Sequence, residues 1–86
     1  MKIKNIKVKL NTVNDVNEFV SYASKLEIEA DVHTVTNGRH VVPADSLLGM
    51  MSLDLTQEVV VLFISDDDRK LDQFIMGCAS AGWVVT

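Results

Sequence analysis

Apolar and polar residues alternate at the start of the chain and then recur at helical spacing. Ile6, Val8 and Leu10 alternate with lysines, which is typical of a half-buried strand over residues 3–10 with the lysines in solvent. Farther on, apolar residues recur three and four positions apart, so we expect a helix that ends near Leu26. The inward face of this helix should consist of Val13, Val16, Phe19, Val20 and Ala23.

The middle of the chain predicts a hairpin. Segments 31–36 and 39–42 are typical of strands, and they flank Asn37-Gly38, the pair that most readily supplies the positive φ angles of a tight turn. Pro43 cannot donate a hydrogen bond within a sheet. The second strand of the hairpin should therefore stop there.

The second half of the chain predicts a short helix, a buried strand and a longer helix. The short helix should span residues 46–53, and the β-branched run 59–64 should be the most buried strand. The polar run 65–68 supplies caps for the last helix, in which Gly77 weakens the helix and Gly82 ends it. Its inward face should consist of Leu71, Phe74, Ile75 and Cys78.

The order of these elements, β-α-β-β-α-β-α, indicates an α/β fold of two layers. The helices would cover one face of the sheet, and the other face would meet solvent. Because 86 residues cannot support two hydrophobic cores, we expect a single domain over residues 1–86.

Composition excludes several classes of function. A net charge of -4 argues against nucleic acid as a partner, because phosphate binding needs a continuous basic surface. The lone Cys78 cannot form an internal disulfide, and no Cys/His spacing suits a metal, so we expect no cofactor and a reducing cytoplasm. No apolar run approaches the roughly 20 residues of a membrane span, so we expect no membrane association.

Three segments carry a family resemblance: NGRHVV at 37–42, SLLGMMSL at 46–53, and ASK at 23–25. Together they resemble the histidine-containing phosphocarrier protein (HPr) family of the bacterial sugar phosphotransferase system over nearly the whole chain. The resemblance implies an open-faced β-sandwich, a four-stranded antiparallel sheet with strand order 1-4-2-3 under three helices. Typical members carry phosphate from enzyme I to sugar transporters on a histidine at the start of the first helix.

The phosphate-carrying residues of the family have no counterpart in this sequence. Alignment on ASK places Thr12 at the histidine position, Asn14 at the following arginine and Asp15 at the following proline. A threonine phosphoester would be a poor phosphoryl donor, and Asp15 and Glu18 would repel phosphate. Thr12 is better explained as the cap of a capping box with Asp15. We therefore expect neither a catalytic residue nor an enzyme.

The short helix matches the family's regulatory and docking region. Ser46 takes the position of the serine that an ATP-dependent kinase phosphorylates in many members, although Asp45 replaces the usual basic residue before it. The family's contact surface for partners corresponds to Leu47, Leu48, Met50 and Met51.

Helical geometry leads to a similar expectation for this helix, because one narrow stripe cannot bury so many large apolar residues. Either Leu48 and Met51 face outward and Leu47 and Met50 inward, or the reverse. Two alternatives stay open: the apolar residues could all be core, and Ser46 could simply cap the helix.

Our leading hypothesis is a noncatalytic, HPr-like regulatory protein of the cytoplasm, with Ser46 phosphorylation as its switch. Its short helix would bind a protein partner: a transcriptional regulator, a phosphotransferase component or HPr kinase. One alternative is a phosphocarrier that uses His33 or His40, although the missing arginine argues against it. Another is a structural domain that associates through residues 59–64 and the tail 83–85. We expect a monomer or a weak homodimer.

Overall fold

The computed structural model describes residues 4–64 and 67–85, and it contains the predicted elements in the predicted order. The predicted caps Ser65 and Asp66, and residue 3 of the first predicted strand, lie outside the described residues. The elements are β1 (Lys4–Val8), α1 (Val13–Lys25), β2 (Ala30–Thr34), β3 (Asn37–Pro43), α2 (Leu47–Met51), β4 (Val59–Phe63) and α3 (Asp68–Ser80).

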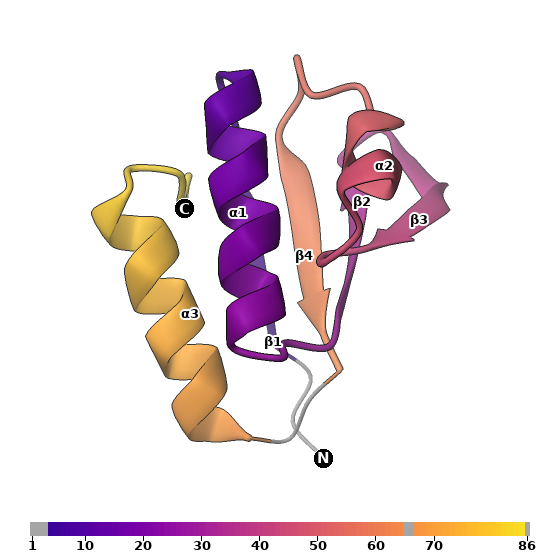
Figure 1. Ribbon diagram of the computed structural model, residues 1–86. Helices are drawn as coiled ribbons and strands as arrows, with labels where there is room; N and C mark the ends of the chain where they lie inside the picture. The colour runs from indigo at the N-terminus through magenta and orange to yellow at the C-terminus, as the bar shows by residue number, and fades with distance from the viewer. Residues whose placement is uncertain (1–3, 65–66, 86) are drawn as a thin grey trace.

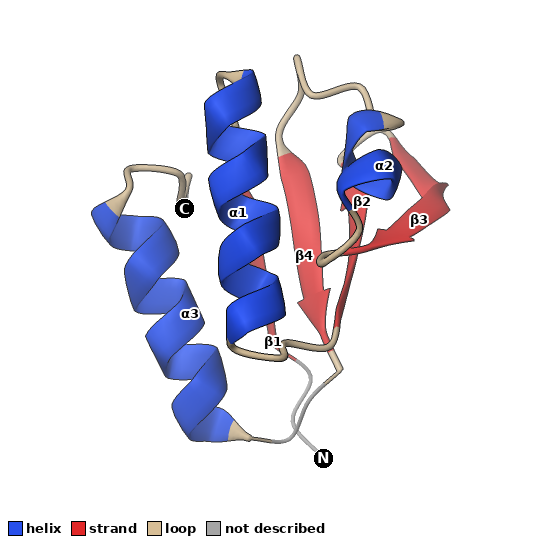
Figure 2. Ribbon diagram, in the orientation of Figure 1, coloured by secondary structure: helices blue, strands red, loops and turns tan. Residues whose placement is uncertain are grey.

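The strands form one four-stranded sheet of order β1-β4-β2-β3 in which every neighbouring pair is antiparallel. The three helices lie on one face of this sheet, with α1 between α3 and α2 (Figure 1). Among the described residues, no helix lies on the opposite face (Figure 2). The predicted open-faced α/β sandwich and its strand order are thus confirmed.

The core lies between the helices and the sheet and is centred on aromatic rings from α1, α3, β4 and the tail. Phe74 of α3 meets Phe19 of α1 with ring centroids 5.4 Å apart, and it meets Phe63 of β4 at 5.8 Å. Trp83, beyond α3, lies edge-on to Phe19 at 6.2 Å. Such edge-to-face pairs add to the free energy gained by burying the rings.

The two long helices bury nearly all of the predicted faces. In α3, Leu71, Phe74 and Cys78 are buried and Ile75 is half-buried, as predicted. Gly82 adopts a φ of 81° just past the cap of α3, so it ends the helix as predicted.

The prediction for α1 is wrong at one position. Val16, Phe19 and Ala23 are buried, but Val13 is 61% exposed. Side chains in the first turn of a helix point back toward its N-terminus, so they can project beyond the layer that the helix covers.

The hairpin turns two residues earlier than predicted. Val35 and Thr36 form the turn, whereas Asn37 and Gly38 belong to β3, and neither of the latter has a positive φ. The pairing of β2 with β4 extends to Thr34, whose Oγ1 accepts a hydrogen bond from the Asn37 N–H at 3.2 Å. Sheet register and this side-chain bond therefore override the turn preference of Asn-Gly.

The prediction that residues 59–64 are the most buried strand is confirmed to the extent that β4 and β2 share the highest burial among the described strands. β4 is central, but its burial alternates, with Val60 and Leu62 only half-buried on the open face and Ile64 48% exposed. β2 has the same alternating pattern. The continuous apolar run thus marks a strand that is covered on one face.

Residues 59–64 do not form the association edge proposed in the third hypothesis, whereas self-association through the tail stays a prediction. β4 is hydrogen-bonded on both sides, to β1 and to β2. Trp83 is buried, and the tail pairs with the edge of β1: the Lys9 N–H donates to the Trp83 carbonyl at 2.8 Å, and the Val85 N–H donates to the Lys7 carbonyl at 3.0 Å. β4 is therefore paired on both sides within the molecule, and the tail is paired on the side of β1.

Candidate functional site

The N-terminus of α1 is closed by the capping box that the sequence predicts. The Thr12 hydroxyl accepts a hydrogen bond from the Asp15 N–H at 3.0 Å. In return, Asp15 Oδ2 accepts from the backbone N–H groups of Asn11 and Thr12 at 3.0 and 3.2 Å. These bonds, chiefly the one from Asn11, hold the pKa of the Asp15 carboxyl below its ordinary value. An ionised carboxylate therefore occupies the helix terminus.

The next residues of α1 offer no positive charge at this terminus. Asn14, predicted at the position of the family's arginine, donates from Nδ2 to Glu18 Oε1 at 3.2 Å. Thr12, Asn14 and Asp15 thus lie together, as the sequence predicts, but their side chains are engaged with one another and with Glu18. This arrangement stabilises the helix terminus.

Ser46 caps α2. Its hydroxyl accepts a hydrogen bond from the Gly49 N–H at 3.1 Å, and its side chain is half-buried. A Cβ at position 49 would lie 3.0 Å from Ser46 Oγ and 3.0 Å from Val42 Cβ, so glycine lets the helix pack closely here. The capping interpretation of Ser46 is confirmed, and its phosphorylation stays a prediction.

α2 exposes most of its apolar side chains. Leu48 is 86% exposed, Met51 46% and Leu47 41%, whereas Met50 is fully buried. The arrangement with Leu48 and Met51 outward is the one observed, and the all-core alternative is wrong. Two corrections follow: Leu47 does not face inward, and Met50 belongs to the core rather than to a contact surface, because it points from this one-and-a-half-turn helix into the protein.

A groove of about 510 Å³ separates the start of α1 from the end of α2 and the loop after it. We call it the α1–α2 groove; it is lined by Lys9, Leu10, Asn11, Thr12, Val13, Val16, Met51, Leu55 and Thr56. The groove brings two predicted site residues, Thr12 and Met51, to one surface. The exposed Val13 lies there too.

Sequence reasoning missed Lys9 and Leu55 in this groove. Lys9 was expected on a solvent face, but it is half-buried, and its ammonium donates to the Leu55 carbonyl at 3.1 Å, to the Leu10 carbonyl at 3.3 Å and to Asn11 Oδ1 at 3.3 Å. The long stem of a lysine can cover apolar surface while its head reaches polar atoms. No local pattern signals a contact between residues 9 and 55.

The two histidines lie on strands and already have hydrogen-bond partners. On β2, His33 Nδ1 lies 2.8 Å from the Thr34 carbonyl. On β3, His40 Nε2 lies 2.9 Å from Ser52 Oγ, whose hydroxyl donates to the Gly49 carbonyl. Neither histidine lines the α1–α2 groove. His40 thus ties β3 to the end of α2.

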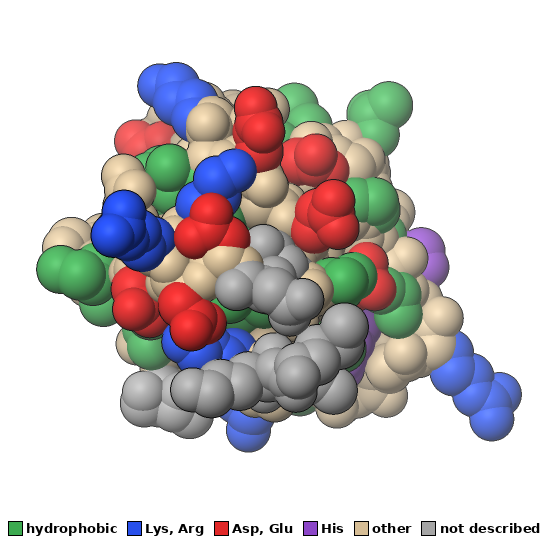
Figure 3. All heavy atoms as spheres, turned by 90° about the horizontal axis from the view of Figure 1, so that it is seen from below, with side chains coloured by type: hydrophobic (Ala, Val, Ile, Leu, Met, Phe, Trp, Pro, Cys, Tyr) green, Lys and Arg blue, Asp and Glu red, His purple; other side chains and the backbone are tan. Residues whose placement is uncertain are grey.

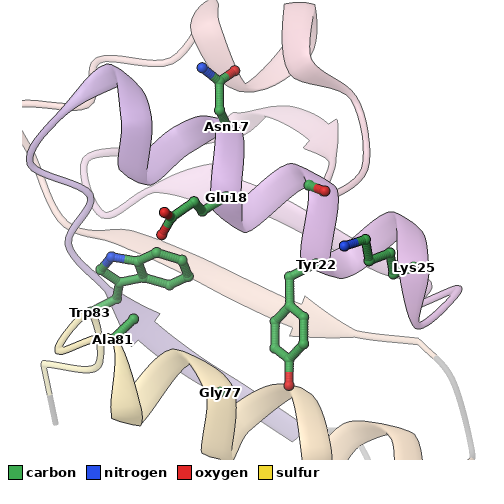
Figure 4. Close-up of a pocket in the computed structure, with 8 residues that line it drawn as sticks. Asn17, Glu18, Tyr22, Lys25, Gly77, Ala81 and Trp83 are labelled. Carbon is green, nitrogen blue, oxygen red and sulfur yellow. The ribbon is translucent and has the colours of Figure 1, made fainter.

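A second pocket, of about 650 Å³, lies between α1 and α3 (Figure 4). The aromatic rings of Tyr22 and Trp83 lie along it, with the Glu18 carboxylate above the Trp83 ring. Both rings are used in packing: Trp83 contacts Phe19, and Tyr22 stacks on Phe74 and donates from its hydroxyl to the Gln73 carbonyl at 2.8 Å. This pocket is therefore explained by the packing of the two helices.

The end of the molecule where α3 begins is a charged surface. Acidic and basic side chains are interspersed there (Figure 3). Lys4 forms ion pairs with Asp68 and Asp72, and Lys70 forms one with Glu27. Such exposed pairs are typical of a solvated surface. The α1–α2 groove lies at the opposite end of α1 (Figure 1).

Metal ligation and membrane insertion find no support within residues 4–64 and 67–85. Over these ranges, no group of three or more His, Cys, Asp or Glu side chains is placed to hold a metal ion. None of the helices described there has the length and apolar character needed to span a membrane.

Comparison with known proteins supports the family resemblance through structure. A scan against protein-family models and a search of the curated proteins give no match. Among solved structures, the chain is similar to HPr-C-His from Thermoanaerobacter tengcongensis, with 29% identity, 93% of each chain covered and a TM-score of 0.66. It also resembles the phosphocarrier protein HPr from Bacillus anthracis in fold, with 17% identity, 86% and 94% of the two chains covered and a TM-score of 0.59.

These structural likenesses agree with the strand order β1-β4-β2-β3 and with the three helices on one face of the sheet. Both likenesses cover nearly the whole described fold. On this combination of fold, topology and sequence likeness, the chain has an HPr-like fold and is similar to HPr phosphocarrier proteins.

Proposed function

We propose that this chain is a noncatalytic, HPr-like regulatory protein related to the bacterial sugar phosphotransferase system, and that it binds a protein partner through α2 and the α1–α2 groove. The observation that carries the proposal is a contrast between two neighbouring sites. The start of α1 is closed by its own carboxylate, whereas α2 presents large apolar side chains to solvent. The protein would act in the cytoplasm by association.

The chemistry at α1 argues against phosphate transfer. A phosphoryl group at Thr12 would lie beside the Asp15 carboxylate, which already accepts the hydrogen bonds of the nearby N–H groups. Two negative groups at one helix terminus repel each other and compete for the same donors. A phosphoester of threonine would also be a poorer donor to a next carrier than a phosphoimidazole.

The exposed residues of α2 support partner binding. Leu48 and Met51 leave large apolar surface in solvent, and contiguous exposed apolar surface often marks a protein interaction site. Methionine suits such a surface because its flexible thioether adapts to different partners. The candidate partners are a transcriptional regulator, a phosphotransferase component or HPr kinase.

Phosphorylation of Ser46 would switch this surface. Ser46 directly precedes Leu47 and Leu48, so a phosphate there would place about -1.5 to -2 charges next to the exposed apolar residues. A phosphate beside Leu47 and Leu48 would change which partner surfaces can bind α2, because the partner would then have to accommodate the negative charge. Because Asp45 is adjacent and also negative, part of the favourable interaction with the helix would be offset.

The test supplies both phosphoryl donors separately. The purified protein is incubated with ATP and HPr serine kinase, or with phosphoenolpyruvate and enzyme I, and intact mass and fragmentation locate any phosphate. We expect one phosphate on Ser46 from ATP and none from phosphoenolpyruvate. Ser46→Ala should remove the modification, whereas Ser52→Ala, at the other end of the same helix, should retain it.

Two outcomes would contradict parts of this proposal. Acid-labile phosphate on His33 or His40 from phosphoenolpyruvate would mean that the protein is a carrier with an atypical acceptor. The absence of phosphate from both donors would remove the serine switch and leave a protein that acts through contacts alone.

A further inference from the structure

We infer that the pocket between α1 and α3 binds a small zwitterionic molecule with an apolar middle, of the size and chemistry of a short free peptide. Its amino group would lie at the Glu18 end of the pocket and its carboxylate at the Lys25 end. The inference goes beyond the proposed function, because none of the residues that line this pocket lines the α1–α2 groove. Its failure would therefore leave partner binding by α2 unaffected.

The packing of α1 against α3 accounts for the walls of the pocket, and the volume of the pocket limits the size of an occupant. That volume is about 650 Å³, within the range of roughly 300–1,000 Å³ that is typical of small-molecule sites. The lining includes the rings of Tyr22 and Trp83 (Figure 4). Tyr22 is fixed by stacking on Phe74, and Trp83 is buried against the core. The two rings thus form a preformed apolar surface.

The end of the pocket at Trp83 is negative. The Glu18 carboxylate lies above the Trp83 ring (Figure 4), and Glu18 Oε1 accepts a hydrogen bond from Asn14 Nδ2 at 3.2 Å. Asp15, which is outside the lining, accepts a hydrogen bond from the Trp83 side chain and adds a second carboxylate near this end. An ammonium group placed here would meet a carboxylate and an aromatic ring, both of which attract cations.

The other end of the pocket is positive. Lys25 lies in the last turn of α1, seven residues after Glu18, so the two side chains share one face of the helix. At a rise of 1.5 Å per residue, their Cα atoms lie about 10 Å apart along the helix axis. Within residues 4–64 and 67–85, the Lys25 ammonium has no hydrogen-bond or ion-pair partner. It is therefore available to an anionic group.

The separation of the two charges selects the class of ligand. A free amino acid carries its ammonium and carboxylate on one carbon atom and cannot reach both Glu18 and Lys25. An extended chain spans about 3.3–3.6 Å per residue, so three residues cover about 10 Å. A tripeptide would bring opposite charges to the two ends and an apolar side chain to Tyr22 and Trp83. The hydroxyl of Ser21, in the lining between Glu18 and Lys25, can bond to its amide groups.

The test uses the tripeptide Gly-Leu-Gly and two capped forms of it, one N-acetylated and one amidated at its C-terminus. Trp83 is the only tryptophan of the chain, so its fluorescence reports on this pocket, and backbone amide NMR signals locate the contact. We expect the free peptide to change the Trp83 emission in a saturable way and to shift the signals of Ser21 and Lys25. Each capped peptide, which lacks one charge, should bind about two- to fivefold more weakly.

Charge reversal tests the two ends of the pocket separately. Glu18→Lys and Lys25→Glu should each weaken binding of Gly-Leu-Gly about two- to fivefold, because each gives both ends the same charge. The double variant restores opposite charges in the reverse order, so the peptide can bind the other way round and affinity should recover. Lys7 and Glu29 are exposed and do not line the pocket, so Lys7→Glu and Glu29→Lys are the matched controls. These controls should bind like the native protein.

Three other outcomes would overturn the inference. Equal affinity for the free and capped peptides would show that the charges do not select the ligand, as would a double variant that binds no better than the single ones. Unchanged Trp83 emission together with unshifted Ser21 and Lys25 signals would mean that the pocket is only a gap between packed helices. Shifts confined to Leu48 and Met51 would place the peptide on α2 instead.

Discussion

At the residue scale, hydrogen bonds between residues close in the sequence cap the N-termini of α1 and α2. Thr12 and Asp15 cap α1, and Ser46 caps α2. These caps could be predicted because donor and acceptor lie three residues apart in the sequence. The role of Lys9 could not, since its partner Leu55 is 46 residues away along the chain.

Asp15→Asn should destabilise the protein in a pH-dependent way. The folded-state pKa of Asp15 is lowered, so its ionised form contributes stability that is present above the ordinary pKa of 3.8 and is lost as pH falls through the folded value. We therefore expect a lower Tm for the variant at pH 7. The difference in Tm from the native protein should shrink as the pH falls below 3.8.

Thermal unfolding followed by circular dichroism between pH 2 and 8 checks this prediction. Glu29→Gln is the control, because it removes an exposed charge away from the cap. A Tm difference for Asp15→Asn that stayed constant with pH would show that the carboxylate charge is not what stabilises the cap.

At the element scale, α2 has two adjacent methionines with opposite environments. Met50 is fully buried and Met51 is 46% exposed. The sequence predicts that such a helix must expose some apolar residues, but it leaves two arrangements open, both of which place Leu47 and Met50 on the same side. In the structure, where α2 packs against α1 and β3, Met50 alone of the four residues Leu47, Leu48, Met50 and Met51 is buried.

Met50→Asp and Met51→Asp should separate core from surface. Met50→Asp creates a cavity and buries a carboxylate without a partner, so we expect a loss of at least about 4 kcal/mol in the free energy of unfolding. Met51→Asp should change it by no more than about 1 kcal/mol. It should also abolish partner capture, because it places a charge in the groove.

Urea denaturation followed by circular dichroism measures both variants under the same conditions. An unfolded Met51→Asp would place this side chain in the core and contradict the docking surface.

At the scale of the whole molecule, close approach of α1 and α3 depends on a glycine. A Cβ at Gly77 would lie 2.2 Å from Cε2 of the Tyr22 ring, which stacks on Phe74. From the sequence, Gly77 was expected only to weaken its helix. The structure gives it a packing role between two helices that lie side by side (Figure 1).

Gly77→Ala should therefore destabilise the protein, although alanine has a higher helix propensity than glycine. We expect a loss of about 1–3 kcal/mol from overpacking against Tyr22. In a Tyr22→Ala background, the same substitution should instead stabilise by up to about 1 kcal/mol, because only the propensity difference remains.

A double-mutant cycle from urea denaturation measures this coupling. Independent, additive effects of the two substitutions would mean that the Tyr22 ring moves aside without cost.

The sequence by itself determined the order of the elements, the caps of α1 and α2, and the buried face of α3. Each of these depends on residues that are close in the chain, through a period of 3.6 residues or a bond across one turn. The family resemblance added the strand order, which the structure confirms.

Only the tertiary structure decided which side chains of these elements face solvent and where the strands end. The turn at Val35-Thr36 follows from the register of β2 on β4, and the half-buried Val60 follows from a sheet with helices on one face only. The α1–α2 groove joins residues 9–16 to residues 51–56. These features depend on contacts between distant segments, and hydrophobic periodicity along one segment carries no information about the segment that packs against it.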